Sequence, residues 1–261
     1  MKACESIITE EKDGIMKITL NNPDALNSMT PALLNETYDA LMEAEENSHV
    51  RVVIITGTGR AYCAGGDLPY ILTLDSTQKS RRYIQDIARI VTAITGMPKP
   101  VIAMVNGVAA GAGFSVALSC DLIFCSRSAR FSQSFVRIGL IPDASGTYFL
   151  PRAIGLYRAK ELMFMGDVID SETARKIGLV NRIVDDDKLE DYTWTFAEKL
   201  AKNAPIALGL MKKILNQSDK LDLQASIEME TGIQLLCLGT EDHKEGVKAF
   251  MEKRKPLFKG L

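Results

Sequence analysis

The chain has 261 residues, of which 46% are hydrophobic and 25% charged, so it can bury a sizeable core in one large domain or in two. Its 31 basic and 33 acidic residues give a net charge of −2, which provides no general attraction to nucleic acid or anionic lipid. No apolar run is long enough to cross a bilayer, so we expect no membrane partner, and an anionic ligand would need a local basic patch.

The amino terminus, MKACESIITEEKDG, carries early acids and no apolar stretch, which predicts a protein without a secretory signal and a cytoplasmic location. The cysteines are odd in number and form no CxxC pair, as expected of buried thiols in a reducing compartment: Cys4, Cys63, Cys120, Cys125 and Cys237. Only His49 and His243 are present, without clustered ligand spacing. The sequence therefore predicts neither a metal site nor a histidine-based triad.

Strands and helices alternate in the first part of the chain. MKITL, residues 16–20, alternates apolar and polar residues like a half-buried strand. Thr30 is a candidate N-cap with Pro31 at the first helical position, and an apolar face continues from there to about Glu46. RVVIIT, residues 51–56, is a β-branched run that predicts a buried strand.

The same alternation continues to the middle of the chain. An apolar helical face is formed by Ile84, Ile87, Val91 and Ile94. MPKP ends that helix before the strand VIAMV, and GFSVALSC then predicts a helix, DLIFCS a strand, and FSQSFVRIGLIPD a further strand and loop. From about Ser171 the pattern is mostly helical, with Pro205 opening a helix that carries Ile206, Leu210 and Ile214.

Two glycine loops follow predicted strands. TGTGRAYCAGGDL fails as a dinucleotide-binding fingerprint, because Tyr62 stands where a third glycine is needed. NGVAAGAGFSVAL leaves the backbone N–H groups of Ala112 and Gly113 free at a helix start, which favours an anionic ligand atom. Close packing of the helix on the strand would also explain its glycines, and no Lys-Ser/Thr pair follows to make a phosphate loop.

The loops in order, CAGGDL, NGVAAGAG with Cys120-Asp121 beyond it, and FSQSFVRIGLIPDASGT, resemble the enoyl-CoA hydratase/isomerase, or crotonase, family. NNPDALNSM (21–29) and EGVKAFMEKRKPLF extend the resemblance over nearly the whole chain. It implies an α/β fold, a spiral of repeated strand-strand-helix units over residues 1–200 with an α-helical C-terminal region over 201–261. It also implies assembly as homotrimers or hexamers.

The resemblance implies an acyl-CoA thioester substrate, with coenzyme A as part of the substrate and no separate cofactor. Two backbone N–H groups, carried over by motif to Gly66 and Ala112, are expected to bind the thioester oxygen. Two preorganised donors stabilise the negative charge that enolate formation places on that oxygen. Asp67, which follows the first donor, is expected near the ligand, and a loop-capping role for its carboxylate is equally open.

Other residues match family contacts to coenzyme A. Four of them surround the adenine and pantetheine in the resemblance: Ala25, Leu26, Ala64 and Leu68. The C-terminal segment adds Phe250 and Lys253, which in the family often reach the coenzyme A of a neighbouring subunit. Lys253, Arg254 and Lys255 could supply the basic patch for its phosphates, or form a solvated charged tail.

The chain departs from the family hydratases at both of their catalytic glutamates. Those positions hold Ser115 and Phe135 here, neither of which can act as a carboxylate base. We expect Phe135 to fill the space of the catalytic water. Ser115 is also a poor candidate nucleophile, because no histidine is near it in sequence.

Asp143, in GLIPDASGT, is the remaining candidate for a catalytic base. Family 3-enoyl-CoA isomerases carry a glutamate there, and ring-epoxide isomerases of phenylacetate breakdown carry an aspartate in a similar GLIPD segment. Leu140, Ile141 and Phe135 would make its setting apolar and raise its pKa. The alternative is an aspartate that caps the turn before Ser145 and Gly146.

The sequence thus predicts an acyl-CoA double-bond isomerase, with Asp143 as proton shuttle and Gly66 and Ala112 as oxyanion hole. The alternatives are a hydratase or other crotonase-type lyase using Asp67 or Asp143, and a non-enzymatic relative that binds acyl-CoA or RNA. The charge balance argues against RNA, because KRK is too short to follow a nucleic-acid backbone. The acyl group is not specified by the sequence.

Overall fold

The computed structural model describes residues 6–261, so Cys4 lies outside the described residues. The strands are β1 (Ile7–Lys12), β2 (Ile15–Leu20), β3 (Val52–Gly57), β4 (Ala61–Cys63), β5 (Val101–Val105), β6 (Val108–Ala110), β7 (Leu122–Ser126), β8 (Arg130–Ser132), β9 (Val168–Asp170) and β10 (Arg182–Val184). The α-helices are α1 (Pro31–Glu46), α2 (Leu68–Ile71), α3 (Thr77–Gly96), α4 (Gly111–Ser119), α5 (Gly146–Ile154), α6 (Leu156–Met165), α7 (Ser171–Lys176), α8 (Leu189–Ala201), α9 (Pro205–Leu215), α10 (Leu223–Leu238) and α11 (Glu241–Met251). Short 3-10 helices are η1 (Pro23–Ala25), η2 (Ser134–Ile138) and η3 (Asp186–Lys188).

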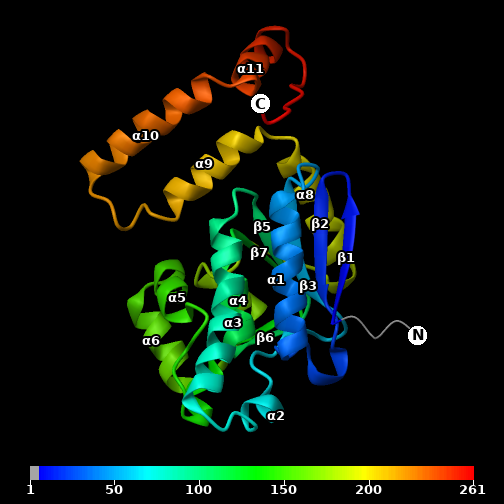
Figure 1. Ribbon diagram of the computed structural model, residues 1–261, viewed down its shortest axis with the longest axis vertical. Helices are drawn as coiled ribbons and strands as arrows, with labels where there is room; N and C mark the ends of the chain where they lie inside the picture. Colours follow the sequence, from blue (N-terminus) through cyan, green and yellow to red (C-terminus); the bar gives the residue numbers. More distant parts are fainter. Residues whose placement is uncertain (1–5) are drawn as a thin grey trace.

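The strands form two sheets, and from β3 to β8 the chain contributes strands to them alternately. One sheet has the order β1-β2-β3-β5-β7-β10 and the other β4-β6-β8-β9. A strand of the first sheet is followed by one of the second and then by helices, in the units β3-β4-α3, β5-β6-α4 and β7-β8-α5. Pairing is parallel except at β1-β2 and β8-β9. The predicted spiral of strand-strand-helix units is therefore confirmed (Figure 1).

The central strands are apolar on both faces because each face is covered. Val53 and Ile55 of β3 join the core that includes α1, α3 and α4. Val52 and Ile54 face the other way and pack with apolar residues of α8 such as Leu189. This two-sided burial explains why VVIIT and VIAMV read as continuous apolar runs instead of alternating ones.

Helix α1 begins with the predicted N-cap residue and proline. The Thr30 side chain accepts a hydrogen bond from Leu33 N at 3.2 Å, and Pro31 is the first residue of α1. One expectation about α3 was wrong in detail, since Ile84 is 49% exposed and Tyr83 takes its place on the buried face. The exposed side chains of β1, IITEEK, gave no apolar alternation from which this edge strand could be predicted.

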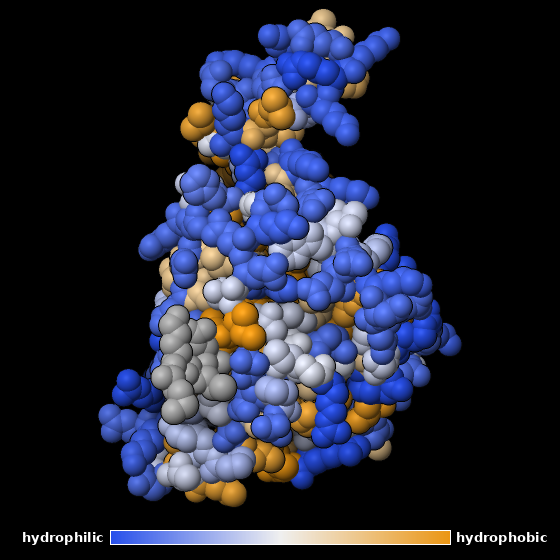
Figure 2. Space-filling model, turned by 90° about the vertical axis from the view of Figure 1, so that its right-hand side faces the viewer, coloured by the Kyte–Doolittle hydropathy of each residue, from blue (hydrophilic) through white to orange (hydrophobic). Residues whose placement is uncertain are grey.

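Helices α9, α10 and α11 extend beyond the body that holds the sheets (Figure 1). Their surface includes large apolar side chains that are mostly exposed, among them Leu215, Leu223, Leu235, Leu236, Phe250 and Met251. Figure 2 shows apolar side chains reaching the surface of this upper part of the molecule. So many exposed apolar residues on one segment are typical of a surface that another chain covers.

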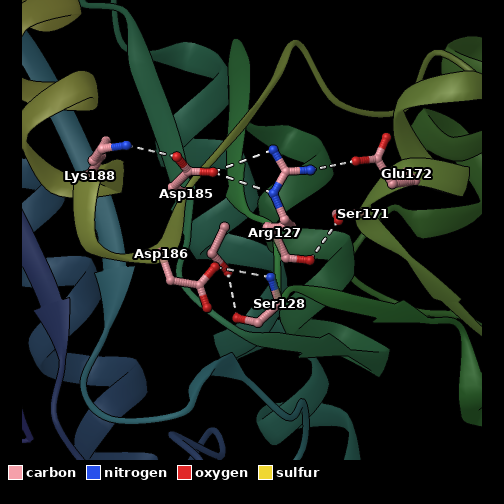
Figure 3. Close-up of polar contacts among 8 residues, drawn as sticks. Arg127, Ser128, Ser171, Glu172, Asp185, Asp186 and Lys188 are labelled. Atoms are coloured by element: carbon pink, nitrogen blue, oxygen red, sulfur yellow. Dashed lines mark hydrogen bonds and ion pairs between the residues drawn. The ribbon is translucent and has the colours of Figure 1, made fainter.

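Ion pairs and hydrogen bonds connect the β7-β8 turn to α7 and to the segment after β10 (Figure 3). Arg127 bridges Glu172 at 2.8 Å and Asp185 at 3.4 Å, and Asp186 accepts from Ser128 N at 3.1 Å. The charged partners are about half exposed, so these ion pairs contribute little to stability.

Within residues 6–261 the structure has no helix that is both long and apolar enough to cross a membrane.

Candidate active site

A cavity of about 460 Å³ opens between the two glycine loops and η2. It brings together seven of the predicted site residues: Ala25, Ala64, Gly66, Asp67, Leu68, Ala112 and Asp143. Its remaining wall is mainly apolar, with Ile71, Ile87, Phe135 and Leu140. Backbone donors and one carboxylate converging in an apolar hollow make this the candidate active site.

The direction of the first candidate donor, Gly66 N–H, is fixed by a hydrogen bond to the carbonyl of the same peptide unit. Gly65 O accepts a hydrogen bond from Met29 N at 2.8 Å, and the peptide bond is trans. In a trans peptide the N–H points opposite to the C=O, so Gly66 N–H points away from Met29. It donates to no other group within residues 6–261, which leaves it available to the cavity that Gly66 lines.

The second candidate donor, Ala112 N–H, lies in the first turn of α4. Donors of a first helical turn have no partner inside the helix, and the helix dipole favours negative charge there. Gly111 reaches this geometry with a φ of 52°. A Cβ added to Gly65 would lie 3.2 Å from Ala112 N, so the two donor loops are in direct contact.

Asp143 lies in the turn between η2 and α5. Its Oδ1 is buried and has no hydrogen-bond partner in the described part of the chain. Burial raises the pKa of Asp143 to about 6, against a lowering contact with its own backbone N–H. Gly146 N donates to the main-chain carbonyl of Asp143 at 2.9 Å, so the backbone closes this turn without the carboxylate, and Asp143 is part of the cavity wall.

The apolar setting of Asp143 differs from the expected one at one residue. Leu140 and Phe135 line the cavity, as expected, whereas Ile141 is 80% exposed and does not line it. The expectation for Ile141 was therefore wrong. The Phe135 ring also lies against the second donor loop, since a Cβ on Gly111 would be 3.7 Å from Phe135 Cζ.

Asp67 lines the cavity, but its carboxylate is occupied by neighbouring groups. Oδ2 accepts from the Ser28 hydroxyl at 2.8 Å, and Oδ1 accepts from Tyr70 N at 2.8 Å as the N-cap of α2. The loop-capping role left open by the sequence is the one that the contacts show. Asp143 is thus the one carboxylate of the cavity wall whose oxygen lacks a partner among residues 6–261.

Ser115 and Phe135 occupy the two positions of the hydratase glutamates in different ways. Ser115 is fully buried in α4, does not line the cavity, and its Oγ accepts from Gln133 Nε2 at 3.3 Å. A Cβ on Gly146 would lie 2.5 Å from that Oγ, so no space is left for a longer side chain. Phe135 is buried and places an apolar ring in the cavity wall.

Three predicted binding residues lie outside the cavity wall. Leu26 is half-buried behind it, with its carbonyl accepting from Ala64 N at 3.0 Å. Phe250 is 85% exposed and Lys253 is exposed, both on or next to α11. A role of these two at coenzyme A would therefore require the site of another subunit, as the resemblance implies.

The cavity wall also includes residues that were not singled out from the sequence, among them Tyr83 of α3 and Arg137 of η2. Tyr83 stands four residues before Ile87, so helical spacing puts it on the apolar face and could have identified it. Arg137 pairs with Asp167 at 3.0 Å, and no sequence pattern relates these two residues.

Comparison with known proteins identifies the family of the chain. The family profile "Enoyl-CoA hydratase/isomerase" matches residues 10–261. The 1,2-epoxyphenylacetyl-CoA isomerase of Escherichia coli is 36% identical, with 98% of this chain and 99% of the relative covered. The crotonyl-CoA hydratase of Syntrophomonas wolfei is 34% identical, with 98% of each covered. A crystal structure of an enoyl-CoA hydratase from Bacillus anthracis superimposes with a TM-score of 0.95 at 36% identity, covering 98% of this chain and 100% of that one. The chain belongs to the enoyl-CoA hydratase/isomerase, or crotonase, family.

Proposed function

We propose that the protein is an acyl-CoA double-bond isomerase that converts a 3-enoyl thioester to a 2-enoyl thioester. The observation that carries this proposal is Asp143, whose buried Oδ1 lacks a partner in the described chain while the glutamate positions of hydratases hold Ser115 and Phe135. A single carboxylate suffices to move a proton, whereas hydration also requires a positioned water.

In this reaction the Asp143 carboxylate takes a proton from C2 of the acyl chain. The C2–H electrons form a C1=C2 bond and the carbonyl pair moves onto the thioester oxygen, which gives a dienolate. When the C3=C4 pair later takes up the proton at C4, the C1=C2 pair becomes the C2=C3 bond and the thioester carbonyl re-forms at that oxygen. The N–H groups of Gly66 and Ala112 bind that oxygen and stabilise the dienolate. Protonated Asp143 then returns its proton at C4, which restores the carboxylate.

The substrate proposed is a coenzyme A thioester, with coenzyme A carried by the substrate and no further cofactor. Ala25, Ala64 and Leu68, which line the cavity, are the residues proposed to contact its pantetheine and adenine. We further propose a homotrimer or a hexamer, because α9, α10 and α11 expose apolar side chains and carry Phe250 and Lys253 away from their own cavity. Sedimentation equilibrium giving a monomer would contradict this assembly.

The test of the reaction is turnover of matched thioesters. We expect purified protein to shift the double bond of a 3-enoyl-CoA and to hydrate crotonyl-CoA far more slowly. Rapid hydration of crotonyl-CoA with the 3-enoyl-CoA left unchanged would favour a hydratase, the activity named for several relatives, and would end the isomerase proposal.

The pH profile should report the ionisation of Asp143. The base acts as a carboxylate, so protonation below its pKa of about 6 removes activity. We expect kcat/KM to rise about tenfold per pH unit below 6 and to level above it. Initial rates between pH 4.5 and 8.5 measure this, and a rate that does not fall below pH 5.5 would contradict a base with this pKa.

Gly65→Ala should disable the oxyanion hole. Gly65 has a φ of 99°, and its Cβ would lie 2.8 Å from Ala110 O and 3.2 Å from Ala112 N, so both donor loops must move. Loss of one oxyanion donor costs about 10²–10³ in kcat, and we expect a loss of about 10²-fold. Gly96→Ala is the matched control, because a Cβ there meets nothing within 4 Å. Equal rates for the two variants would contradict the assignment of these loops.

A further inference from the structure

Tyr83 makes contacts that no step of the proposed reaction uses. Its side chain is 5% exposed, its ring lines the cavity, and it packs on Tyr70 with ring centroids 5.3 Å apart. Its hydroxyl donates to Met29 O at 2.7 Å and accepts from Asp67 N at 3.0 Å. Both of its hydrogen bonds therefore go to the backbone, and none goes to another side chain.

The two backbone atoms bound by the hydroxyl, Met29 O and Asp67 N, belong to residues next to the Gly66 donor. Met29 N donates to Gly65 O and so fixes the peptide unit that carries Gly66 N–H. Tyr83 holds the carbonyl of the same Met29 and also the N–H of Asp67, the residue after Gly66. The hydroxyl thus connects Met29, which lies just before α1, to the far end of the Gly65-Gly66-Asp67 segment.

We infer that Tyr83 is a positioning residue of the oxyanion hole, whose hydroxyl fixes the direction of Gly66 N–H. This inference rests on the proposed use of Gly66 as a donor. Without the hydroxyl, Met29 O and Asp67 N lose their shared partner, and they already belong to a parallel bridge between Met29 and Gly66. The turn would close towards Met29, and Gly66 N–H would turn with it.

The hydroxyl also keeps Asp67 N–H occupied. This amide points towards Met29, on the opposite side of the backbone from Gly66 N–H. Because Tyr83 takes the Asp67 N–H, the loop presents Gly66 N–H as its free donor beside Ala112 N–H. Preorganised donors of this kind stabilise charge without having to reorient during the reaction.

The test compares Tyr83→Phe with Tyr70→Phe. Both variants lose one hydroxyl from the same pair of contacting rings, but within residues 6–261 only the Tyr83 hydroxyl bonds to the donor loop. We expect Tyr83→Phe to lower kcat about tenfold or more with KM within about threefold, a part of the 10²–10³-fold effect of losing a donor. Tyr70→Phe should stay within about twofold of the unchanged protein.

A second readout separates positioning from general stability. The coenzyme A thioester of 4-(dimethylamino)cinnamic acid absorbs at longer wavelength when donors polarise its carbonyl. We expect a red shift on binding to the unchanged protein and to Tyr70→Phe, and loss of most of that shift in Tyr83→Phe at a Kd within about threefold. A full shift in Tyr83→Phe would overturn the inference.

Should Tyr83→Phe fail to fold, 4-aminophenylalanine at position 83 keeps the ring and a donor for Met29 O. It accepts poorly from Asp67 N, so an intermediate shift is expected, and an undiminished one would overturn the inference.

The isomerase proposal and the positioning role of Tyr83 can also fail separately. A protein that isomerises no 3-enoyl-CoA but loses the shift in Tyr83→Phe contradicts the isomerase and supports the positioning role, whereas full turnover and full shift in Tyr83→Phe contradict the positioning role alone.

Discussion

Asp143→Asn is expected to lower kcat for 3-enoyl-CoA isomerisation by about 10³-fold, with KM changed by only a few-fold. The amide has nearly the same shape as the carboxylate, so the cavity and the two donor loops are retained. It cannot accept a proton from C2, and a positioned general base contributes about 10²–10⁴ to such a rate. Steady-state kinetics with a 3-enoyl-CoA measure both constants, and near-normal turnover would reject Asp143 as the shuttle.

The same substitution should not weaken the fold. The pKa of Asp143 is about 6 in the folded protein and about 4 in an unfolded chain, so ionisation above pH 6 opposes folding. This cost, up to about 3 kcal/mol, disappears as the pH falls from 6 towards 4. We expect Asp143→Asn to be as stable as the unchanged protein or more stable at pH 8, with a smaller gain at pH 4.

A surface aspartate provides the control for the expected changes in kcat and in the free energy of unfolding. Asp75→Asn makes the same change at a side chain that is 70% exposed and paired with Lys79, so both kcat and stability should stay unchanged. Urea unfolding at pH 8 and pH 4 completes the comparison. A marked loss of stability in Asp143→Asn would show that the carboxylate makes structural contacts that its free Oδ1 does not indicate.

Much of the fold could be predicted because its elements obey local rules. Thr30 and Pro31 begin α1, and the β-branched run of β3 is buried on both faces, so each sequence pattern had a single structural outcome. The edge strand β1 escaped prediction because pairing with β2, and not an apolar pattern, makes it a strand. Its side chains after Ile7 are exposed and carry no period-2 signal.

The candidate site was predictable where a motif fixes the backbone. Gly66 and Ala112 converge because each follows a strand of the same sheet, β4 and β6, which pair in parallel. The unused oxygen of Asp143 could not be predicted, because it depends on the turn that follows. Ala144 and Ser145 both have positive φ, 48° and 61°, a conformation that non-glycine residues rarely adopt. The contacts of Tyr83 could not be predicted for a related reason, since its hydroxyl bonds to backbone atoms 54 and 16 residues away in the sequence.

An ion pair between a buried lysine and a partly exposed aspartate joins the C-terminal helices to the body, and it too connects distant segments. Lys212 of α9 is 7% exposed, and its Nζ lies 2.8 Å from Asp121 Oδ2. It also donates to Ile94 O at 2.7 Å and to Lys99 O at 3.0 Å. All three donor positions of the ammonium group are thus used in one place.

Lys212→Met should therefore destabilise the protein by about 1–3 kcal/mol, because the change removes the donor shared by Ile94 O, Lys99 O and Asp121, and leaves the carboxylate, whose side chain is 22% exposed, with Val101 N as its remaining partner. Lys213→Met, an exposed neighbour on the same helix, is the matched control and should be nearly neutral. The double variant Lys212→Met with Asp121→Asn removes the unpaired charge and should recover part of the loss. Urea unfolding measures all three, and a Lys212→Met variant as stable as Lys213→Met would contradict this account.

The loss should also depend on pH, with a sign that identifies Asp121 as its source. Burial already raises the pKa of Asp121 against the lowering effect of Lys212. Without the lysine, the folded-state pKa rises further above the unfolded value, so ionisation opposes folding at neutral pH and the penalty fades as the carboxyl takes up a proton. We expect the deficit of Lys212→Met to be larger at pH 8 than at pH 5. A deficit independent of pH would instead assign the loss to the carbonyl contacts at Ile94 and Lys99.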